Sequence, residues 1–389
     1  MQQLKLAAAM TALACTAMTA SAADVQIYGR VSTGLTYQNV RHVDKSTFGI
    51  SNGLQSHDQS RFGLKGKEDL GNGLYVGFQL ESGFQLDSGE LADAKNDRLF
   101  DRVARLYVGN GFGEVSFGQM AGFTIAAEPY SIYARLRANM TTTSMQGFAP
   151  AAYTFQPGFL SNAIAFKTNA KNGFFVQGIY SNGDSKKAED QEAKYDWSDR
   201  RHVGQLAAGW VGQQLRVGGV LSYEMPGNTN ATAKKRDATQ GLHLIASYDF
   251  GGPAVSTVFY HGKNEWRLGA VSDMATIIGG SNGINGQEII NKSTEGMTTN
   301  ALFFSASYPM GPHTFSGALG GVKAVWKGET AGLRYDDGSA ILGGVKYCYN
   351  FSKKTFAYSA LSYARGDDLL GRIARYNQVF ASVGMTHHF

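Results

Sequence analysis

The residue patterns that most often signal catalysis or metal binding are weak in this chain. The run 63–67 contains glycines and lysines like a phosphate loop, but it lies within a predicted strand and no helix follows it. The pair His387-His388 cannot bind one metal ion from a strand, because neighbouring side chains point to opposite faces. No order of Ser, His and Asp suggests a nucleophile. The sequence therefore predicts neither an enzyme nor a cofactor.

The remaining cysteine and the basic run also have ordinary interpretations. Cys348 is the only cysteine once a predicted leader is removed, so no internal disulfide is expected. It lies between two tyrosines and is predicted to be a small buried apolar residue. The run 234–236 is basic but lies in a loop rich in Gly, Asn and Thr, and the formal net charge of +5 is mild. No nucleic-acid partner is expected.

The elements that must position the charged residues are predicted to be short strands. Charged residues make up 17% of the chain, and ~25% is usual. Gly, at 49 of 389 residues, and aromatic residues, at 12%, are frequent instead. Side chains alternate with period two, as at 25–33 and 60–67, and only 120–140 suggests a weak helix. These features indicate many strands joined by tight turns.

The first residues are predicted to be a secretory leader rather than part of the fold. Lys5 supplies a charged start, residues 6–17 are apolar or small, and Ala-Ser-Ala at 20–22 forms a cleavage site. The expected organisation is a signal peptide over 1–22, removed after Sec-type export, and a single domain over 23–389. Beyond the leader no apolar run reaches ~18 residues, so no membrane-spanning helix is predicted.

Short and long connections alternate along the chain, and this alternation predicts a closed barrel. Seven short connections rich in Gly, Asn and Pro alternate with eight long polar ones. The long ones are expected at about 38–59, 86–97, 120–158, 183–201, 226–239, 265–298, 327–338 and 366–374. The count gives sixteen antiparallel strands, a pattern typical of an outer-membrane β-barrel. Closure is expected because every backbone group in lipid must be paired.

The two faces of the predicted strands differ in polarity. One face of most strands is apolar and is expected to contact lipid, whereas the other carries Gln, Ser, Thr, Gly, Arg and Lys. Sixteen strands enclose more volume than side chains can fill, so the lumen is expected to hold water. The sequence therefore predicts an all-β transmembrane barrel with an aqueous channel.

Glycine-rich strand motifs recur at defined places in the chain. They stand at 27–30, 60–66, 68–74, 78–84, 107–109, 112–115, 117–118 and 383–389. Together they resemble the Gram-negative trimeric general porins, most closely the betaproteobacterial branch. The resemblance implies a homotrimer in the bacterial outer membrane, surrounded by lipids and lipopolysaccharide, through which small hydrophilic solutes and ions diffuse passively. The terminal Phe389 resembles the family's assembly signal, which the outer-membrane assembly machinery recognises.

The resemblance also implies where the channel is narrowest. In the family the third long loop, here 120–158, folds into the barrel, and basic side chains on the wall face acidic groups on that loop. The field between them orients solutes and sets ion preference. The matching or neighbouring positions proposed for this constriction are Arg30, Arg61, Arg98, Arg102 and Glu128.

Some positions depart from the family pattern. The usual Arg of the fourth strand aligns with Ala104, and Gln119 stands where the branch often has Arg. Arg105 has the opposite strand parity to Arg102, which places it at the lipid or at a subunit interface and not in the pore. Facing lipid at the midplane, it would cost ~2–4 kcal/mol. The set of wall charges is therefore expected to differ from that of the family branch.

The charge of the predicted constriction loop favours anions. Glu128 is the only acid between residues 120 and 158, while Arg135 and Arg137 are both present. Family members with several loop acids prefer cations, so a weak to moderate anion preference is expected here. Glu128 is expected to face the wall arginines, to anchor the loop by accepting backbone N–H bonds, or to do both.

Other functions compete with passive diffusion. Aromatic residues within 120–158 leave open a substrate-selective channel, and the long loops 183–201 and 265–298 leave open a second role as adhesin or receptor. The loop 120–158 could also form an external flap. A barrel enzyme is disfavoured, because such enzymes usually have twelve or fewer strands.

Overall fold

The computed structural model describes residues 25–41, 44–51, 59–93, 98–125, 127–138, 154–169, 173–183, 200–227, 234–269 and 272–389. The predicted leader, 1–22, lies outside the described residues, and so does part of the predicted constriction loop.

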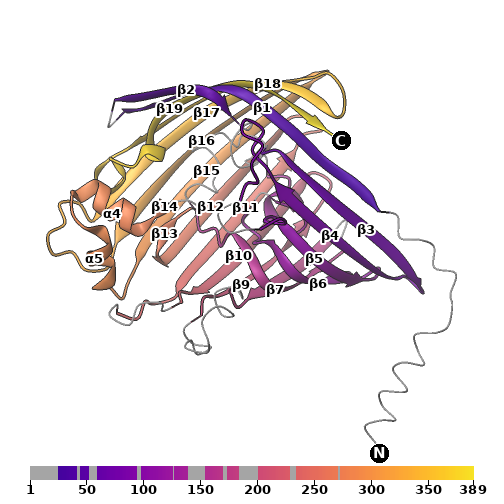
Figure 1. Ribbon diagram of the computed structural model, residues 1–389, viewed down its shortest axis with the longest axis horizontal. Helices are drawn as coiled ribbons and strands as arrows, with labels where there is room; N and C mark the ends of the chain where they lie inside the picture. Colours follow the sequence, from indigo (N-terminus) through magenta and orange to yellow (C-terminus); the bar gives the residue numbers. More distant parts are fainter. Residues whose placement is uncertain are drawn as a thin grey trace, which may run out of the picture.

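The strands form one closed antiparallel barrel (Figure 1). Its first strands are β1 (Gln26–Val40), β2 (Lys45–Ser51), β3 (Arg61–Gly71), β4 (Leu74–Gly83), β5 (Val103–Gly109), β6 (Gly113–Ala121), β7 (Phe159–Thr168) and β8 (Gly173–Ser181). They continue with β9 (His202–Val211), β10 (Leu215–Met225), β11 (Thr239–Asp249), β12 (Ala254–Glu265), β15 (Met297–Met310), β16 (His313–Trp326), β17 (Asp337–Asn350), β18 (Thr355–Gly366) and β19 (Asn377–His388).

The wall has sixteen strand positions, as the turn pattern predicts. The sheet contains 17 strands, but β2 and β3 pair with successive parts of the same edge of β1 and so occupy one position. The predicted long connection 38–59 therefore contains a strand segment. Each of the seven predicted short turns joins two neighbouring strands, and the prediction of a sixteen-stranded barrel is confirmed.

The barrel closes where the two ends of the chain meet. Strand β19 pairs with β1, and the ladder continues to Phe389, whose N–H donates to Gly29 O at 3.1 Å. The Phe389 ring covers Gly29, where a Cβ would lie 2.5 Å from ring atom Cζ. A Cβ would also lie 2.4 Å from the backbone oxygen of Arg61, so glycine is required here by both the terminal ring and the neighbouring strand.

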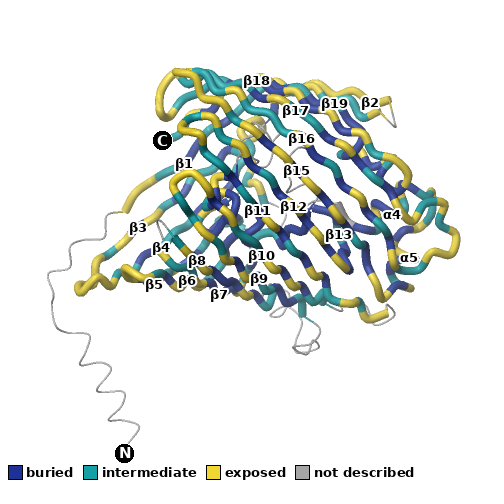
Figure 2. Tube along the Cα trace, turned by 180° about the vertical axis from the view of Figure 1, so that it is seen from behind, coloured by how far each residue is buried: buried dark blue, intermediate teal, exposed yellow. Residues whose placement is uncertain are grey.

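Buried and less buried residues alternate along much of the strands, as Figure 2 shows, and this is the pattern of side chains that point inward and outward in turn. On β15 the outward Leu302 and Phe304 are exposed, while the inward Ala301 and Phe303 are buried. The exposed apolar face is the surface that lipid covers in an outer-membrane barrel. Among the described residues, none of the helices has the length and apolar character needed to cross a membrane.

The long connections carry the helices. A single turn, α2 (Ile132–Arg135), forms within the predicted weak helix 120–140. Between β12 and β15 lie the short pair β13 (Arg267–Leu268) and β14 (Ser272–Asp273), then α4 (Met274–Asn282) and α5 (Gly286–Asn291). The sequence did not predict α4 and α5, because glycines within and between them weaken the helical pattern.

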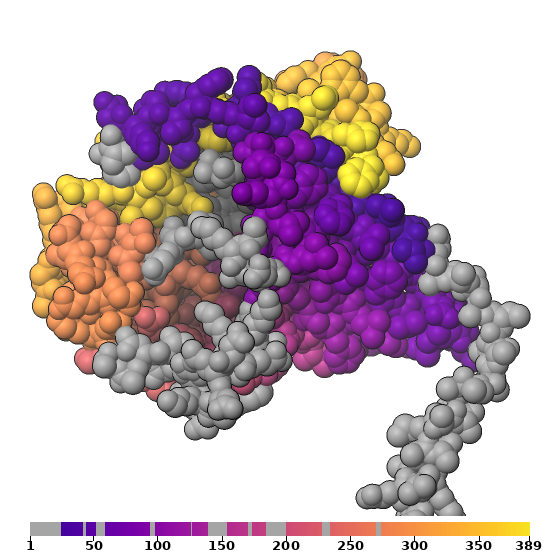
Figure 3. Space-filling model, viewed as in Figure 1, coloured from indigo at the N-terminus to yellow at the C-terminus, as the bar shows by residue number. Residues whose placement is uncertain are grey.

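Helix α4 packs against the connection between β18 and β19, which contains η6 (Asp368–Leu370) and η7 (Ala374–Tyr376). The Ser281 hydroxyl donates to Leu369 O in that connection. Asn282 Nδ2 donates to Tyr335 O, in the connection between β16 and β17, at 3.2 Å. Figure 3 shows the orange helices beside the yellow η segments at one rim of the barrel.

The described part of the connection 122–158 lies inside the barrel rather than outside it. Its apolar side chains Phe123, Tyr133 and Leu136 belong to one buried cluster with the inward wall residues Phe175 and Val220. An external flap is therefore not what these residues form. The segment contacts the inner faces of the wall strands from β6 to β11.

Candidate functional site

Three of the predicted constriction residues gather on the inner face of β1 to β5, at the long-loop ends of β3 and β4. Arg102 Nε donates to Glu81 Oε1 at 2.7 Å, and Arg61 Nε lies 3.6 Å from Glu81 Oε2. Tyr28 Oη donates to Glu81 Oε2 at 3.1 Å. Residues Tyr28, Arg61, Glu81 and Arg102 are here called the upper cluster. Arg30 pairs with Arg61 across the β1–β3 ladder, and its Nε donates to Gln59 O at 3.3 Å.

The other two predicted residues lie apart from the upper cluster. Arg98 belongs to the connection between β4 and β5, where its Nε is 3.9 Å from Asp93 Oδ2. Glu128 lies on the inserted loop and lines a cavity together with Arg135 and Lys167. The structure thus brings Arg30, Arg61 and Arg102 together and separates them from Arg98 and Glu128.

A bend before β5 points Arg102 into the barrel. Asp101 Oδ1 accepts the Gly83 N–H at 2.8 Å, and Gln119 Nε2 donates to Asp101 O at 2.5 Å. These bonds hold residues 101–102 out of the regular strand, so that Arg102 and Arg105 both face inward although their parities differ. Gln119 stands where the family branch often has Arg, and here it orients the neighbouring Arg102.

The expectation that Arg105 faces lipid or a subunit interface is wrong. Arg105 is 8% exposed, whereas its outward neighbour Leu106 is 55% exposed. Its Nη1 donates to Glu114 Oε1 at 2.5 Å and to Ser116 Oγ at 2.8 Å. The strand parity predicted from Arg102 does not reach Arg105, because the bend at 101–102 interrupts the regular strand. No charge therefore faces lipid at this position.

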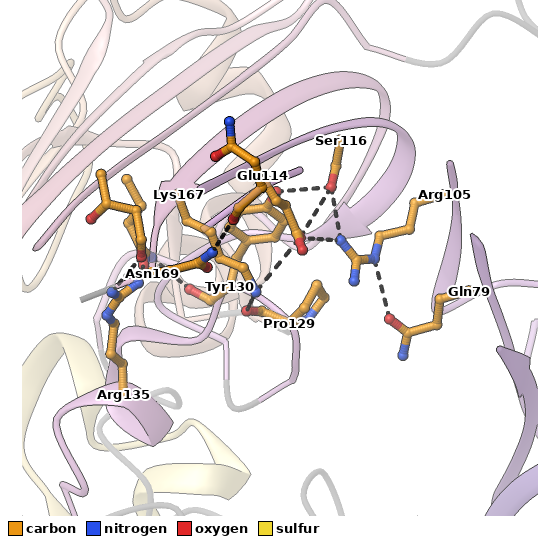
Figure 4. A network of polar contacts seen from close by, with 12 residues as sticks. Gln79, Arg105, Glu114, Ser116, Pro129, Tyr130, Arg135, Lys167 and Asn169 are labelled. Atoms are coloured by element: carbon orange, nitrogen blue, oxygen red, sulfur yellow. Dashed lines mark hydrogen bonds and ion pairs between the residues drawn. The ribbon is translucent and has the colours of Figure 1, made fainter. Parts of the chain in front are cut away.

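Arg105 belongs to a second group, shown in Figure 4 and here called the lower cluster, which comprises Arg105, Glu114, Ser116, Tyr130 and Lys167. Lys167 Nζ lies 3.6 Å from Glu114 Oε1. The loop residue Tyr130 donates from its hydroxyl to Ser116 Oγ at 2.9 Å. In this cluster, as in the upper one, a single carboxylate lies between two cations.

Gln79 connects the two clusters into a continuous belt. Gln79 Nε2 donates to Tyr28 Oη at 2.8 Å, and Arg105 Nε donates to Gln79 Oε1 at 3.2 Å. The upper cluster, Gln79 and the lower cluster are together called the charged belt. It runs obliquely across β1 and β3 to β7, from the long-loop ends of β3 and β4 to the short-turn ends of β6 and β7.

The inserted loop is attached to the wall at the lower cluster and beyond it. Lys167 Nζ donates to Pro129 O at 3.3 Å, and Gln177 Nε2 donates to Tyr130 O at 2.7 Å. Arg135 Nη2 donates to Thr168 O at 2.7 Å, at the short-turn end of β7. Because these bonds use backbone carbonyl groups of the loop and the wall, they fix the path of the loop rather than one side chain.

Glu128 is exposed to the lumen, yet the surrounding wall removes part of its water. Burial raises the pKa of Glu128, while the positive charges of Lys167, Arg105 and Arg135 act in the opposite direction. Burial lowers the pKa of the Arg135 guanidinium, and Glu128 opposes that change. Glu128 therefore shares its surroundings with Arg135 and Lys167, with which it lines one cavity.

The acidic members of the belt, Glu81 and Glu114, were not predicted from the sequence. Glu81 and Glu114 each stand within a strand on its polar face, and Lys167 has the matching parity on β7. An acid at an inward position of a predicted barrel strand is the signal that could have identified them. Their partners are distant in sequence, so no local spacing reveals the pairing.

Comparison with known proteins agrees with this architecture. The family model described as Gram-negative porin matches residues 7–369. An outer membrane porin protein of Bordetella pertussis is 28% identical over 383 residues, which cover 94% of each chain.

Solved structures share the fold. The anion-selective porin from Comamonas acidovorans has a TM-score of 0.62 and 21% identity, with 94% of this chain and 100% of that chain covered. The trimer form of OmpT, an outer membrane protein of Vibrio cholerae, has a TM-score of 0.58 and 14% identity, with 95% and 100% covered.

The family match extends over most of the chain, and the closed sixteen-stranded barrel is the architecture that the similar structures share. The chain therefore belongs to the Gram-negative porin family, whose members are channels of the bacterial outer membrane and not enzymes.

Proposed function

We propose that this porin passes small hydrophilic solutes and ions with a weak to moderate preference for anions, and that the charged belt sets the preference. Arg30, Arg61, Arg98 and Arg102 are the proposed cations of the pore wall, with Arg105 and Lys167 added from the structure. Glu128 is the proposed opposing acid on the loop.

The observation that carries the proposal is the ratio of cations to carboxylates in the belt. Glu81 lies between Arg61 and Arg102, and Glu114 lies between Arg105 and Lys167. Each cluster therefore keeps a positive excess after its carboxylate is neutralised. Walls of low dielectric constant focus such a field across the lumen.

The wall across the lumen carries less charge. The inward residues of β15 are uncharged and comprise Met297, Thr299, Ala301, Phe303 and Ser305. A belt of charge opposite an uncharged strand gives the lumen a transverse field, and a permeant anion is expected to follow the belt.

The proposed assembly is a homotrimer in an outer membrane of lipids and lipopolysaccharide. The trimer form of the similar Vibrio cholerae structure supports the oligomeric state. Export through the leader 1–22 and recognition of Phe389 by the assembly machinery complete the proposed route. The exposed Phe389 ring at the barrel seam is compatible with that second role.

Single-channel recording in a planar bilayer tests the proposal. Under a KCl gradient the reversal potential should lie on the anion side, and openings should occur in steps of three. Arg61→Gln should move the reversal potential toward the cation side. Lys353→Gln, in the exposed short turn between β17 and β18, is the matched charge control and should leave it unchanged.

Two results would contradict the proposal. A cation preference in the wild-type channel would refute the assignment of the belt while leaving the porin fold intact. Equal shifts for Arg61→Gln and Lys353→Gln would show that overall charge, rather than the belt, sets the selectivity.

A further inference from the structure

The charged cavity lined by Arg135 and Lys167 lies below the inserted loop, at the short-turn end of the barrel. Its volume is about 990 Å³. It is bounded by the ends of β3, β4, β7 and β8 and by the loop segment that contains α2. In a porin the short turns face the periplasm. We call this space the periplasmic vestibule.

Three cations line the vestibule: Lys67, Arg135 and Lys167. Arg135 is held in place through Thr168 O. Lys167 is held through Pro129 O, as Figure 4 shows. Lys67 shares the inward face of β3 with Arg61, and its Nζ lies 3.7 Å from the centre of the Tyr75 ring. Within the described part of the chain, Lys67 has no carboxylate at salt-bridge distance.

Two carboxylates also line the vestibule, and they differ in their engagement. Asp69 Oδ1 accepts the Gly71 N–H at 2.8 Å, so that oxygen is already engaged in the turn that joins β3 to β4. Glu128 makes no hydrogen bond or ion pair to the described residues and is open to the cavity. It is therefore the one acid there that competes with a bound anion for the three cations.

We propose that the periplasmic vestibule is a second anion-binding site, separate from the upper cluster, which takes small multivalent oxyanions such as phosphate or carboxylate compounds. Lys67 supplies the uncommitted charge, and Arg135 and Lys167 supply a fixed positive background. The site lies beyond the loop, so it is filled from the periplasmic side. It rests on the proposed channel function but not on the anion preference assigned to the upper cluster.

Side-specific block by inorganic phosphate tests the site. Phosphate is added at constant ionic strength to one compartment and then to the other, and the open-channel current of oriented channels is recorded. Block should be stronger from the short-turn side. Lys67→Gln should weaken that block by at least about fivefold, because a unit charge about 4 Å from an anion in water contributes that much.

Lys65→Gln is the matched control. Lys65 lies on the same face of β3, with its Nζ 5.1 Å from the Tyr28 ring, but it does not line the vestibule. The variant should retain the block from the short-turn side. Lys67→Arg should restore the block, and Glu128→Gln should strengthen it, because the competing carboxylate is lost.

Each alternative result overturns the site. Equal weakening by Lys65→Gln and Lys67→Gln would mean that general lumen charge causes the block. Equal block from both sides would place the anion at the upper cluster, and absence of block would show that phosphate does not bind. None of these results would alter the anion preference in KCl, so failure of the site and failure of the proposed function are distinguishable.

Discussion

The upper and lower clusters have nearly the same chemistry but different surroundings. In each, one buried glutamate lies between two cations and accepts or approaches a tyrosine hydroxyl. The upper cluster consists of wall residues and of Arg102, which is set by the bend before β5. The lower cluster also includes Tyr130 and adjoins Pro129, both of which belong to the inserted loop.

One arrangement of charges can therefore serve two purposes in a barrel. A group confined to the wall sets charge without controlling the shape of the lumen. A group that includes a loop residue links the charge of the wall to the position of the loop. Changes in the upper cluster should therefore alter selectivity, and changes in the charged residues of the lower cluster should alter both selectivity and steadiness of the current.

The largest expected effect is that of Glu114→Gln. It leaves Arg105 and Lys167 without their carboxylate in a buried position, and breaking a buried ion pair in this way costs about 3–5 kcal/mol. The thermal transition of the detergent-folded barrel should fall, and the open current should become noisy as the loop loosens. Circular dichroism on heating and single-channel recording measure the two effects.

Glu81→Gln is the matched comparison for Glu114→Gln. It should also lower the thermal transition, because Arg61 and Arg102 lose a buried partner, but its current should stay steady. If both variants gave equally noisy channels, the distinction between the two clusters would be refuted.

The next effect tests the bend that orients Arg102. Gln119→Leu removes two bonds to backbone carbonyls of residues 100 and 101, each worth about 1 kcal/mol. Arg102 should leave Glu81 part of the time, so the anion preference should fall, though less than in Arg102→Gln. The reversal potential in a KCl gradient measures this order.

Ser161→Ala provides the control for Gln119→Leu, because Ser161 Oγ donates to the opposite side of the same amide, at 3.1 Å from Gln119 Oε1. It should change selectivity little. A selectivity in Gln119→Leu equal to that of wild type would show that the bend is held by Asp101 alone.

The regular strands of the barrel could be predicted from the sequence, whereas the bend and the loop contact could not. The strand number and turns follow from local signals, namely period-two alternation and Gly-Asn turns, and the structure confirms both. Arg30 and Arg61 could be placed on an inward face because their strands are regular there.

The position of Arg105 could not be predicted in the same way. Its orientation depends on the bend at 101–102, and that bend is held by Gly83 and Gln119, about eighteen residues away on either side. The attachment of Tyr130 to Ser116 is likewise a contact between loop and wall. Local periodicity carries no information about such contacts.

A smaller effect is expected for Tyr130→Phe. The change removes the hydrogen bond to Ser116 Oγ but keeps the buried ring, so the loss should be about 1 kcal/mol. The current should fluctuate more than in wild type while the reversal potential stays the same. Tyr223→Phe, on the exposed outward face of β10, is the control, and fluctuations of the same size in both variants would contradict a role for Tyr130 in holding the loop.

The smallest expected effect is a pH dependence of the anion preference that arises from the loop residue Glu128 and not from either cluster. Burial raises the pKa of Glu128, so this carboxyl takes up a proton at a higher pH than an ordinary glutamate, for which the value is about 4.3. Protonation removes a negative charge opposite Arg135 and Lys167, and the anion preference should therefore rise as the pH falls through that range. The reversal potential measured from neutral to acidic pH should show one step in wild type and none in Glu128→Gln, which should be anion-preferring throughout. A step of the same midpoint that survives in Glu128→Gln would assign the titration to another carboxylate and leave the loop without a separate electrostatic role.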